Sequence, residues 1–408
     1  MFNSKFSRRN FLKTLGAATA LPALSSLSSV SFAASGQAEH TVINVFLRGA
    51  MDSISAIVPY TEQAYFDARP TIAIPEAGRI PLNEQFALHS ALSPLKPLYD
   101  QGDLALIVAA GLGPKSATRS HFSAQRRMES GSDDNLQVDG WMGRYLAANT
   151  GSNAVFRGVG MGKVQKSLRG YDSALGLSSL SSFKIKARGL NAQVVPDTLR
   201  KLYQDIDHPI LANEAVQTLS ALDVAAANAL GSTAKPADYG TSKVGTALHQ
   251  VAELLNADLG LESANVDFGG WDFHREIGHW NGGDLSIKFS ELSTALAAFY
   301  NEIAAKQSNV TIVVMSEFGR RVKENTSGGA DHGKGGAMMV LGAGISGGQI
   351  YGDWPGLAPE NLHKGDLKVT TDYRQVLSEL VDRRLGRADL LDVTFPDYRP
   401  DQYLGIFG

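Results

Sequence analysis

The segment TIVVMSEFGRRVKENTSGGADHGKGG, residues 311–336, places polar side chains directly after an apolar run. Residues 311–315 are β-branched or apolar and do not alternate with polar positions, which predicts a parallel strand buried on both faces. Ligands of open α/β sheets collect outside the carboxyl ends of such strands. Four polar residues follow the run: Ser316, Glu317, Asp331 and His332. Their types and positions predict a functional site at that edge of a sheet.

Ionic pairing and turn capping give a plainer interpretation of the same segment. Glu317 would then pair with a neighbouring arginine, and Asp331 would cap a turn. A functional site is favoured because a second carboxylate and imidazole, Asp272 and His274, stand upstream in GGWDFH. Positions i and i+2 of an extended chain project to one side, so these two side chains can serve one ligand.

Other predicted strands also end in polar residues. Strands are predicted at 41–47 and 104–110, with a shorter one near Asn265. The polar residues that follow these strands are Asp52, then Ser120 and His121, then Asp272 and His274. The carboxyl ends of parallel strands share one edge, so we expect these groups to converge. Carboxylates and imidazoles suit a divalent metal ion, and a hydroxyl at a helix N-terminus suits a nucleophile that attacks an anionic ester.

Each of these residues also has a structural alternative. Asp52 could end a strand in a turn, Ser120 could cap a helix, and His121 could fill the core. Arginines are candidates to clamp an anionic substrate, with surface ion pairs as the alternative. The arginine candidates are Arg48, Arg119 and Arg320.

The N-terminus contains SRRNFLK, residues 7–13, followed by a modestly apolar stretch and a Ser/Ala-rich segment. This pattern is a twin-arginine export signal. The apolar stretch is shorter than the ~20 residues that span a bilayer, so no stable membrane anchor is expected. Cleavage is expected after Ala33. The pattern predicts export of the folded protein by the twin-arginine translocase to the periplasm or the extracellular space.

The composition limits the kinds of site and partner. The chain contains no cysteine, so neither disulfides nor thiolate ligands can contribute. A metal would be held by carboxylates, imidazoles or hydroxyls, which suits Zn, Mn, Mg or Ca. After removal of residues 1–33, 34 of the 38 basic side chains remain against 41 acidic ones, a formal charge of −7. Nucleic acid is therefore not expected as a partner.

The length predicts more than one structural unit. After cleavage, 375 of the 408 residues remain, more than the ~250–300 at which a single core stops growing. Residues 165–260 are rich in Ala, Leu and Ser with helical periodicity, which predicts a helical insertion. The α/β core would comprise residues 34–164 and 261–408 as a doubly wound, mostly parallel sheet.

Several blocks together resemble a family of exported bacterial proteins, domain of unknown function 1501. The blocks are the twin-arginine leader, FLRGAMDSISAIVPY, FALHSALSPLKPLYDQGDLALI, RSHFSAQRRMESG, MSEFGRRVKENTSGGADHGKGGAMMVLG and TTDYRQVLSEL. The resemblance covers nearly the whole mature chain, and SEFGR and DHG are its most specific parts. That family looks like a distant branch of the alkaline phosphatase and sulfatase superfamily. The resemblance implies an alkaline phosphatase-like fold in which two divalent ions flank a hydroxyl or formylglycine nucleophile.

The resemblance also implies roles by position. The implied metal ligands are Asp52, Asp272, His274, Glu317 and His332, and Asp331, directly before His332, is a further candidate ligand. Ser120 would be the nucleophile, but Ser53 competes because GAMDS stands where the family has GGxDG. Glu317-Phe318 replaces the superfamily's Asp-His pair and lacks an imidazole, so one ion, two ions or none remain open.

Two functions follow from these predictions. The first is an exported metal-dependent hydrolase of small anionic phosphate or sulfate esters, in which Ser120, Ser53 or His121 would take part in catalysis. The second is a non-catalytic exported binding or assembly protein with a degenerate metal site on the same fold. A sulfatase that makes formylglycine from cysteine is excluded because the chain has no cysteine.

Overall fold

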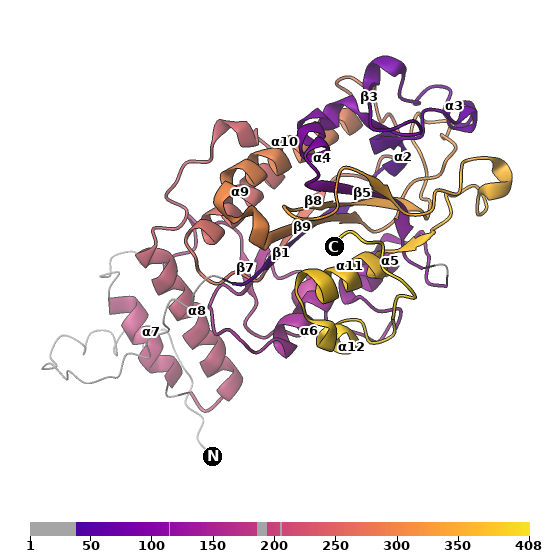
Figure 1. The fold of residues 1–408 in the computed structure, drawn as a ribbon. Coiled ribbons are helices and arrows are strands. Elements are labelled where there is room, and N and C mark those ends of the chain that lie inside the picture. Colours follow the sequence, from indigo (N-terminus) through magenta and orange to yellow (C-terminus); the bar gives the residue numbers. More distant parts are fainter. Residues whose placement is uncertain (1–37, 114, 186–193, 205) are drawn as a thin grey trace, which may run out of the picture. The chain divides into compact units, whose positions relative to one another are not determined.

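The computed structural model describes residues 38–113, 115–185, 194–204 and 206–408 (Figure 1). The predicted signal peptide and its cleavage site after Ala33 lie outside the described residues. Contacts within the chain separate residues 184–224 from residues 34–183 and 225–408. The larger unit contains every residue predicted for the site.

A large sheet is the centre of the larger unit, and its strands neighbour one another in the order β11-β5-β10-β9-β1-β8-β6-β7, with β12 pairing β5 outside this path. The strands of this sheet are β1 Thr41–Arg48, β5 Leu104–Gly111, β6 Gly158–Met161, β7 Leu175–Leu177, β8 Ser263–Gly269, β9 Val310–Ser316, β10 Gly336–Leu341, β11 Ile350–Tyr351 and β12 Thr371–Asp372. All but one of these strands run in the same direction.

The exception is β10, and its pairings on both sides show that the strands beyond it still run in the common direction. Strand β1 pairs in parallel with β8 on one side and β9 on the other. Strand β10 is antiparallel to both β9 and β5, so β5 runs in the same direction as β1, β8 and β9. The carboxyl ends of these four strands therefore lie at one edge, as predicted.

Helices cover both faces of the sheet, with α9 and α10 on one face and α6, α11 and α12 on the other (Figure 1). The helices of the larger unit are α2 Ser53–Ala56, α3 Gln63–Ala68, α4 Lys96–Asp100, α5 His121–Ser130, α6 Trp141–Ala148, α9 Lys243–Asn256, α10 Asp284–Glu302, α11 Tyr373–Glu379 and α12 Leu391–Thr394. The predicted fold class, an α/β doubly wound and mostly parallel sheet, is confirmed by this arrangement.

The strands that end at the site are deeply buried. Every residue of β5 and β9 is buried, as are the first seven of β1. One core cluster packs Phe46 and Met315 of the sheet against Ala124 and Met128 of α5. Burial on this scale holds the strand ends, and hence the loops that follow them, in fixed positions.

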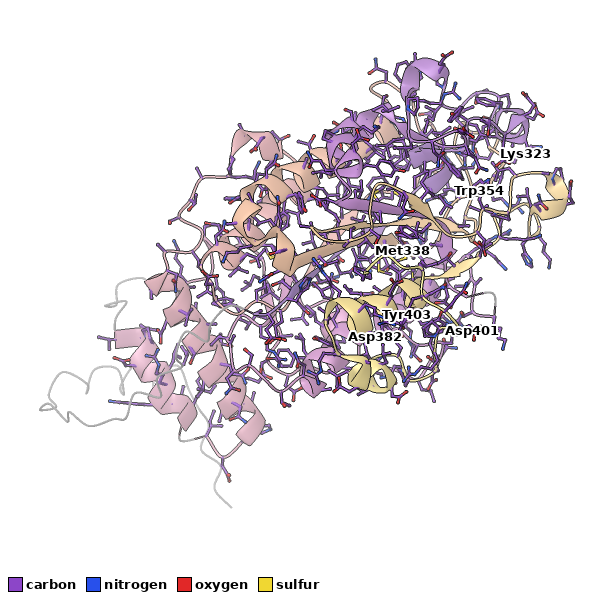
Figure 2. The ribbon with its side chains drawn as sticks, in the orientation of Figure 1. Lys323, Met338, Trp354, Asp382, Asp401 and Tyr403 are labelled. Atoms are coloured by element: carbon purple, nitrogen blue, oxygen red, sulfur yellow. The ribbon has the colours of Figure 1, made fainter. Side chains whose placement is uncertain are left out.

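A small sheet lies apart from the large one. It pairs β2 Ile57–Val58 and β3 Arg79–Pro81 with β4 Ala87–His89 between them. Phe86, just before β4, contacts the ring of Trp354 edge-on with centroids 5.2 Å apart. Figure 2 labels Trp354. This contact joins the segment between β1 and β5 to the segment that follows β11.

Residues 184–224 contain α7 Val194–Gln204 and most of α8 Pro209–Ala227. An ion pair between Arg200 and Asp223 joins the two helices. The predicted helical insertion at 165–260 is longer than this unit, because it also includes strand β7 and helix α9 of the larger unit. The boundaries of the insertion stay a prediction. No helix among the described residues has both the length and the apolar character needed to cross a membrane.

Candidate metal centre

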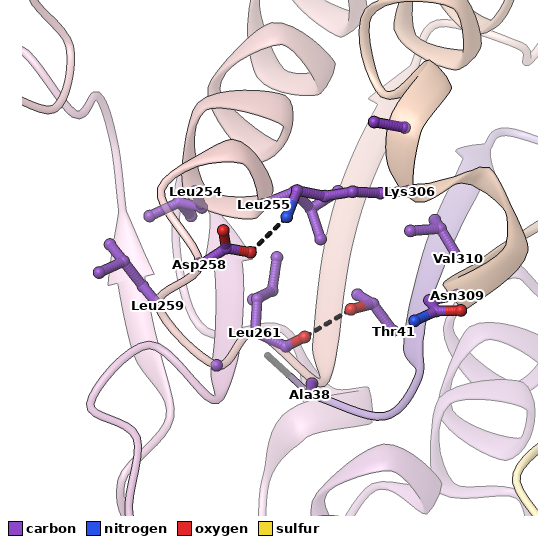
Figure 3. A pocket seen from close by; sticks show the side chains of 12 residues that line it. Ala38, Thr41, Leu254, Leu255, Asp258, Leu259, Leu261, Lys306, Asn309 and Val310 are labelled. Atoms are coloured by element: carbon purple, nitrogen blue, oxygen red, sulfur yellow. Dashed lines mark hydrogen bonds and ion pairs between the residues drawn. The ribbon is translucent and has the colours of Figure 1, made fainter. Parts of the chain in front are cut away.

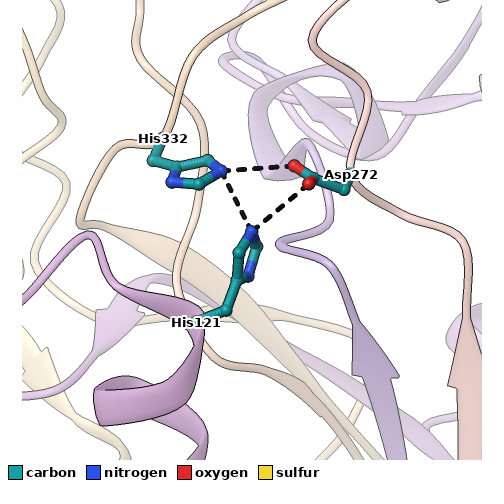
Figure 4. A group of neighbouring side chains, drawn as sticks. All are labelled: His121, Asp272 and His332. Atoms are coloured by element: carbon teal, nitrogen blue, oxygen red, sulfur yellow. Dashed lines mark hydrogen bonds and ion pairs between the residues drawn. The ribbon is translucent and has the colours of Figure 1, made fainter.

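Three side chains from distant parts of the sequence meet at the carboxyl edge of the large sheet (Figure 4). His121 is the first residue of α5, Asp272 lies in the loop after β8, and His332 lies in the loop after β9. Their potential ligand atoms all lie within 4.8 Å of one another. His274, two residues after Asp272, contacts the same group.

The imidazole Nε2 atoms form the centre of this group. His332 Nε2 lies 3.0 Å from His121 Nε2 and 2.8 Å from His274 Nε2. The Asp272 carboxylate lies 3.2 Å from both His332 Nε2 and His274 Nε2 through Oδ1, and 3.5 Å from His121 Nε2 through Oδ2. Three imidazoles and one carboxylate therefore face one point. The side chains of His121, His274, His332 and Asp272 are called the metal group below.

The outer nitrogen of His121 determines which tautomer it adopts. Its Nδ1 lies 2.7 Å from Glu317 Oε1, an oxygen that also accepts hydrogen bonds from the Gly49 amide and the Gln125 side chain, each at 2.9 Å. An oxygen that accepts from two other donors acts as an acceptor here too, so His121 Nδ1 donates its proton. The lone pair of the neutral ring is then on Nε2.

The other two imidazoles follow the same rule. His332 Nδ1 donates to the backbone carbonyl of Arg119 at 2.8 Å, because a carbonyl can only accept. His274 Nδ1 lies 3.1 Å from Asp331 Oδ1. Hydrogen bonds from Asn325 and then His274 hold the pKa of Asp331 below its usual value, so this carboxylate is ionised and accepts.

When neutral, the three imidazoles would direct Nε2 lone pairs toward one another across 3.0 Å, between His121 and His332, and 2.8 Å, between His274 and His332. Such lone pairs repel unless a proton or a cation lies among them. Two nitrogen ligands that each lie about 2.1 Å from one tetrahedral zinc ion are separated by about 3.4 Å, somewhat more than the 2.8 and 3.0 Å between these Nε2 atoms. Histidines whose outer N–H groups are held by carboxylates or a carbonyl are the usual ligands of protein metal sites. The donor set fits a divalent ion of the zinc type.

The group is open to solvent on one side. The side chain of Asp272 is 48% exposed and that of His274 is 39% exposed, whereas His121 and His332 are 24% and 23% exposed. Structural metal sites are closed, while catalytic sites keep an accessible position for water or substrate. The exposure of this group resembles the second kind.

The positive charge of Arg320 affects the pKa values of Asp272 and His332. Its Nη2 donates to Asp272 Oδ1 at 2.7 Å. Partial burial acts to raise the pKa of Asp272, but the hydrogen bond and the charge of Arg320 outweigh it, so the net shift is downward. The pKa of His332 is lowered, chiefly by partial burial and also by the positive charge of Arg320, although its hydrogen bonds with the Arg119 carbonyl and Asp272 act to raise it. Both shifts favour the deprotonated forms that bind metal.

The loops that carry these side chains are held together by hydrogen bonds from Arg320 and by a close backbone approach at Gly49. Arg320 also donates to the carbonyls of Ala50 and Ala330, at 2.8 and 3.0 Å, and forms a bridge with His332. Gly49 has φ +120°, and a Cβ there would lie 2.6 Å from the Asp272 amide nitrogen. A side chain at Gly49 would therefore push the Asp272 loop away from the strand end.

Phe318 forms an apolar floor beneath the group. It is buried, and its ring centroid lies 4.9 Å from that of His121 and 5.1 Å from that of His332. This position is the one where the resemblance implied a lost imidazole. The phenyl ring packs against two imidazoles and limits water to the exposed side of the group.

The structure does not bring Asp52 into the group. Asp52 is buried, and its Oδ2 pairs with Arg69 Nη1 at 2.7 Å. Among the described residues, its Oδ1 has no hydrogen-bond partner. Arg69, whose side chain is fully buried, also donates to the carbonyls of Arg321 and Val322. Asp52 thus lies in a buried ion pair that contacts the backbone of residues 321–322, in the loop that follows β9.

Glu317 and Asp331, which were predicted as metal ligands, lie on the outer, Nδ1 side of the imidazoles. Glu317 is fully buried, and its Oε1 is occupied by three donors, including His121. Asp331 accepts from His274 and Asn325. Both carboxylates orient imidazoles instead of facing the centre of the group.

The predicted substrate-binding arginines already have partners. Arg48 pairs with Glu129 and Asp267, at 2.9 and 2.8 Å. Arg119 pairs with the buried Asp366, and Arg320 pairs with Asp272. These guanidinium groups neutralise carboxylates of the protein. The alternative interpretation of the sequence was surface ion pairs, whereas each arginine has a pair with at least one buried member.

The two candidate nucleophiles occupy different environments. Ser120 is exposed at the N-cap of α5, directly before His121, and within the described chain its side chain makes no capping hydrogen bond to that helix. Ser53 is buried in the four-residue helix α2. Of the two hydroxyls, that of Ser120 lies beside a residue of the metal group and in contact with solvent.

Sequence reasoning missed the residues that orient the group. Gln125 bridges Arg48 and Glu317, and Asn325 holds both Asp331 and the carbonyl of His274. The position of Gln125 one helical turn after His121 was the available signal, because residues four apart share one face of a helix.

Two cavities lie elsewhere in the larger unit. A cavity of about 60 Å³ opens at the amino ends of β1 and β9, the sheet edge opposite the metal group, beside an ion pair of Lys306 with Asp258 (Figure 3). A second, of about 230 Å³, is lined by His89, Trp280 and several aliphatic side chains. Neither cavity is lined by a residue of the metal group.

Comparisons with known sequences agree with two of the predictions. Residues 212–392 match the family described as protein of unknown function DUF1501. Residues 5–25 match the twin-arginine translocation pathway signal. The chain is therefore exported to the periplasm or beyond, and the predicted resemblance is confirmed over the matched residues. Among curated proteins, no match to the sequence is found.

Solved structures with similar folds are distant in sequence. Alkaline phosphatase from the Antarctic bacterium TAB5 aligns at TM-score 0.32 and 12% identity, over 76% of this chain and 92% of that one. The C-terminal periplasmic domain of EcEptC from Escherichia coli, solved with Zn, aligns at 0.39 and 8%, over 74% and 73%. The PsFucS1 sulfatase from Pseudoalteromonas sp. aligns at 0.39 and 13%, over 90% and 72%. At these TM-scores the matches decide neither activity nor metal content.

Proposed function

With a DUF1501 match over residues 212–392 and a twin-arginine signal before it, we propose that this chain is an exported metal-dependent hydrolase of phosphate or sulfate esters. The observation that supports the metal site most strongly is the convergence of three Nε2 lone pairs beside the Asp272 carboxylate. The substrate class is the one that the sequence resemblance implies.

The ligands of the ion would be His121, His274, His332 and Asp272. A bound divalent cation would supply Lewis acidity that polarises an ester oxygen. Because Arg320 occupies Asp272 Oδ1, the carboxylate presents Oδ2 more freely. The resemblance to two-ion enzymes is not matched by a second group, since the described residues contain one such cluster of potential ligands. A single ion is therefore proposed.

The outer residues of the group keep the imidazoles ready to bind. Glu317, Asp331 and the Arg119 carbonyl hold the Nδ1 protons, so each ring in its neutral form presents an unprotonated Nε2. Phe318 restricts water on the buried side. These contacts are formed before any ligand arrives, so little reorganisation is needed on binding.

Ser120 is the proposed nucleophile. Its hydroxyl lies at the N-cap of a ten-residue helix, where first-turn amides favour negative charge. Its exposure leaves it accessible to an ester, whereas Ser53 is buried. Attack by Ser120 on phosphorus or sulfur would form a covalent ester and release the alcohol, and hydrolysis of that ester would restore the hydroxyl.

The test combines metal analysis with a panel of substrates. Protein purified from the periplasm is expected to contain about one zinc-type ion per chain, as measured by mass spectrometry of the metals. Aryl phosphate, aryl phosphodiester and aryl sulfate should then be compared for hydrolysis by the wild type and by Ser120→Ala and Ser53→Ala. Loss of activity in Ser120→Ala alone supports the proposal. Activity that survives both changes eliminates the serine step.

One observation favours a second candidate, a non-catalytic exported metal-binding or assembly protein. The three arginines that could clamp an anionic substrate are all paired with carboxylates of the protein. Stoichiometric metal without turnover of any substrate in the panel would support this candidate over the hydrolase.

A further inference from the structure

Asp366 is a fully buried carboxylate that the proposed function leaves without a role. Both of its oxygens accept from Arg119, with Nε to Oδ2 at 2.9 Å and Nη2 to Oδ1 at 2.6 Å. Arg321 Nε lies 3.6 Å from Asp366 Oδ1. One carboxylate thereby contacts two cationic side chains from different segments.

Those two segments are the ones that supply His121 and His332. Arg119 stands two residues before His121, and Arg321 lies in the loop between β9 and β10 that contains His332. Backbone hydrogen bonds add to the connection, because Arg321 forms a bridge with Asp366 and the Gly335 amide donates to Leu367. The turn around Asp366 therefore joins two of the loops that form the metal group.

The link to the metal group runs through the backbone of Arg119. Its carbonyl accepts the Nδ1 proton of His332 at 2.8 Å, while its guanidinium is held by Asp366. The side chain of Arg119 is 37% exposed, whereas Asp366 is completely buried. Without the bidentate pair, little else would hold the partly exposed Arg119 side chain, and its carbonyl would lose an anchor.

We propose that Asp366 is a positioning residue for the metal ion: its pair with Arg119 fixes the carbonyl that orients His332. This inference rests on the metal-binding function proposed above. Residues that orient ligand imidazoles typically change metal affinity by about 10- to 100-fold when they are replaced. We therefore expect Asp366→Asn to weaken metal binding by that factor while His121, His274, His332 and Asp272 are all retained.

A matched control is needed because any buried ion pair affects stability. Arg157 and Glu262 form one, with Nε to Oε1 at 2.6 Å and Nη2 to Oε2 at 3.0 Å, and their side chains are 3% and 10% exposed. They stand just before β6 and β8, at the amino ends of these strands. Glu262→Gln thus perturbs a similar pair at the opposite edge of the sheet.

The experiment measures the dissociation constant of Zn²⁺ by competition with a chromogenic chelator, using the mature protein. It also records the visible absorption spectrum of the Co²⁺-substituted form. The variants are Asp366→Asn, Arg119→Met, Arg119→Lys and Glu262→Gln. Folding is checked by circular dichroism and urea denaturation for each variant.

We expect Asp366→Asn and Arg119→Met to weaken Zn²⁺ binding by a similar factor and to alter the Co²⁺ spectrum. The double variant should lose little more than either single one, because both remove the same contact. Arg119→Lys should recover part of the affinity, since lysine keeps the charge but not the bidentate geometry. Glu262→Gln should lower stability and leave Zn²⁺ affinity within about twofold.

Unchanged Zn²⁺ affinity in Asp366→Asn, together with lowered stability, would overturn the proposal. If Asp366→Asn does not fold, Arg119→Met decides, because its side chain is partly exposed. A wild type that binds no Zn²⁺ would instead remove the proposed function itself, and thus the two failures are distinguishable.

Discussion

Two aspartates, Asp52 after β1 and Asp272 after β8, each pair with an arginine, but they end in opposite environments. The side chain of Asp52 is 4% exposed beside Arg69, while that of Asp272 is 48% exposed beside Arg320. Both ion pairs are 2.7 Å long. Pairing with arginine therefore does not by itself distinguish a structural carboxylate from a potential ligand.

The second oxygen of each aspartate makes the difference. Asp52 Oδ1 is buried and, among the described residues, has no partner. Asp272 Oδ2 lies 3.5 Å from His121 Nε2 on the open side of the group. Asp52 thus belongs to the interior that supports the loops, and Asp272 belongs to the surface where a ligand can arrive. This comparison makes four predictions.

Asp52→Ala should have the largest effect on stability. It would leave the Arg69 guanidinium buried without a counter-charge, which costs about 3–5 kcal/mol. Urea denaturation of the metal-free protein measures the loss. Asp52→Asn, which keeps a hydrogen-bond acceptor, should lose less. An unchanged midpoint in Asp52→Ala would mean that the two aspartates do not differ as described.

Asp272→Ala should affect metal binding and leave the fold nearly intact. Loss of one ligand is expected to weaken Zn²⁺ affinity by about 100-fold or more. The unfolding free energy of the metal-free protein should fall less than in Asp52→Ala, because Arg320 is buried but Asp272 itself is half exposed to solvent. Equilibrium dialysis measures the affinity. Asp267→Ala is the control, because Asp267 pairs with Arg48 near the same strand end but lies outside the group. Equal affinities in the two variants would contradict a ligand role for Asp272.

His89, in the small sheet near Asp52, should lower the free energy of unfolding at acidic pH. Burial lowers the pKa of His89 to about 4, and the charge of Asp52 opposes this only in part. Between pH 6.5 and 4 the unfolded chain binds the proton and the folded chain does not, so stability falls as the pH falls through that window. The loss attributable to His89 is roughly 2–3 kcal/mol at pH 4.

The measurement compares metal-free wild type with His89→Gln by urea denaturation at pH 7 and pH 4. Glutamine can accept from the Ala91 amide as His89 Nδ1 does, but it does not titrate. The variant should lose less stability than the wild type on acidification. Parallel losses would place the acid sensitivity elsewhere in the protein.

Glu317→Gln should have the smallest effect of the four. The amide keeps the shape of the carboxylate but weakens its hold on His121 Nδ1, which is expected to lower Zn²⁺ affinity by about tenfold. Glu379→Gln is the control, since Glu379 is a buried carboxylate that accepts from the Leu404 and Phe407 amides. Equal affinity in Glu317→Gln and the wild type would remove Glu317 from the orientation of the group.

Much of the fold could be predicted from local sequence. The largely apolar runs that form β1, β5 and β9 do not alternate with polar residues, which is expected only where a strand is covered on both faces. The shared edge for their carboxyl ends followed from the parallel arrangement. The antiparallel strand β10 between β5 and β9 did not disturb it, because two reversals of direction cancel.

The composition of the metal group could be predicted only in part. Asp272, His274 and His332 were named as ligands, and the structure brings these three together. His121 was expected to be catalytic or buried in the core; the structure places it in the same group, and a catalytic role stays a prediction. Asp52 and Glu317 were expected to reach the same ion, but each is held away by partners that are distant in sequence.

The sequence by itself determined the export signal, the exclusion of thiolate ligands, the buried parallel strands and the residue types available at their ends. Only the tertiary structure decided which carboxylates face solvent and which face arginines. Strand patterns depend on contacts with close neighbours, which periodicity records. Whether a carboxylate is buried in an ion pair or exposed beside the imidazoles depends on loop packing around it. That packing places Arg69 beside Asp52 and Arg320 beside Asp272, and no local sequence pattern contains it.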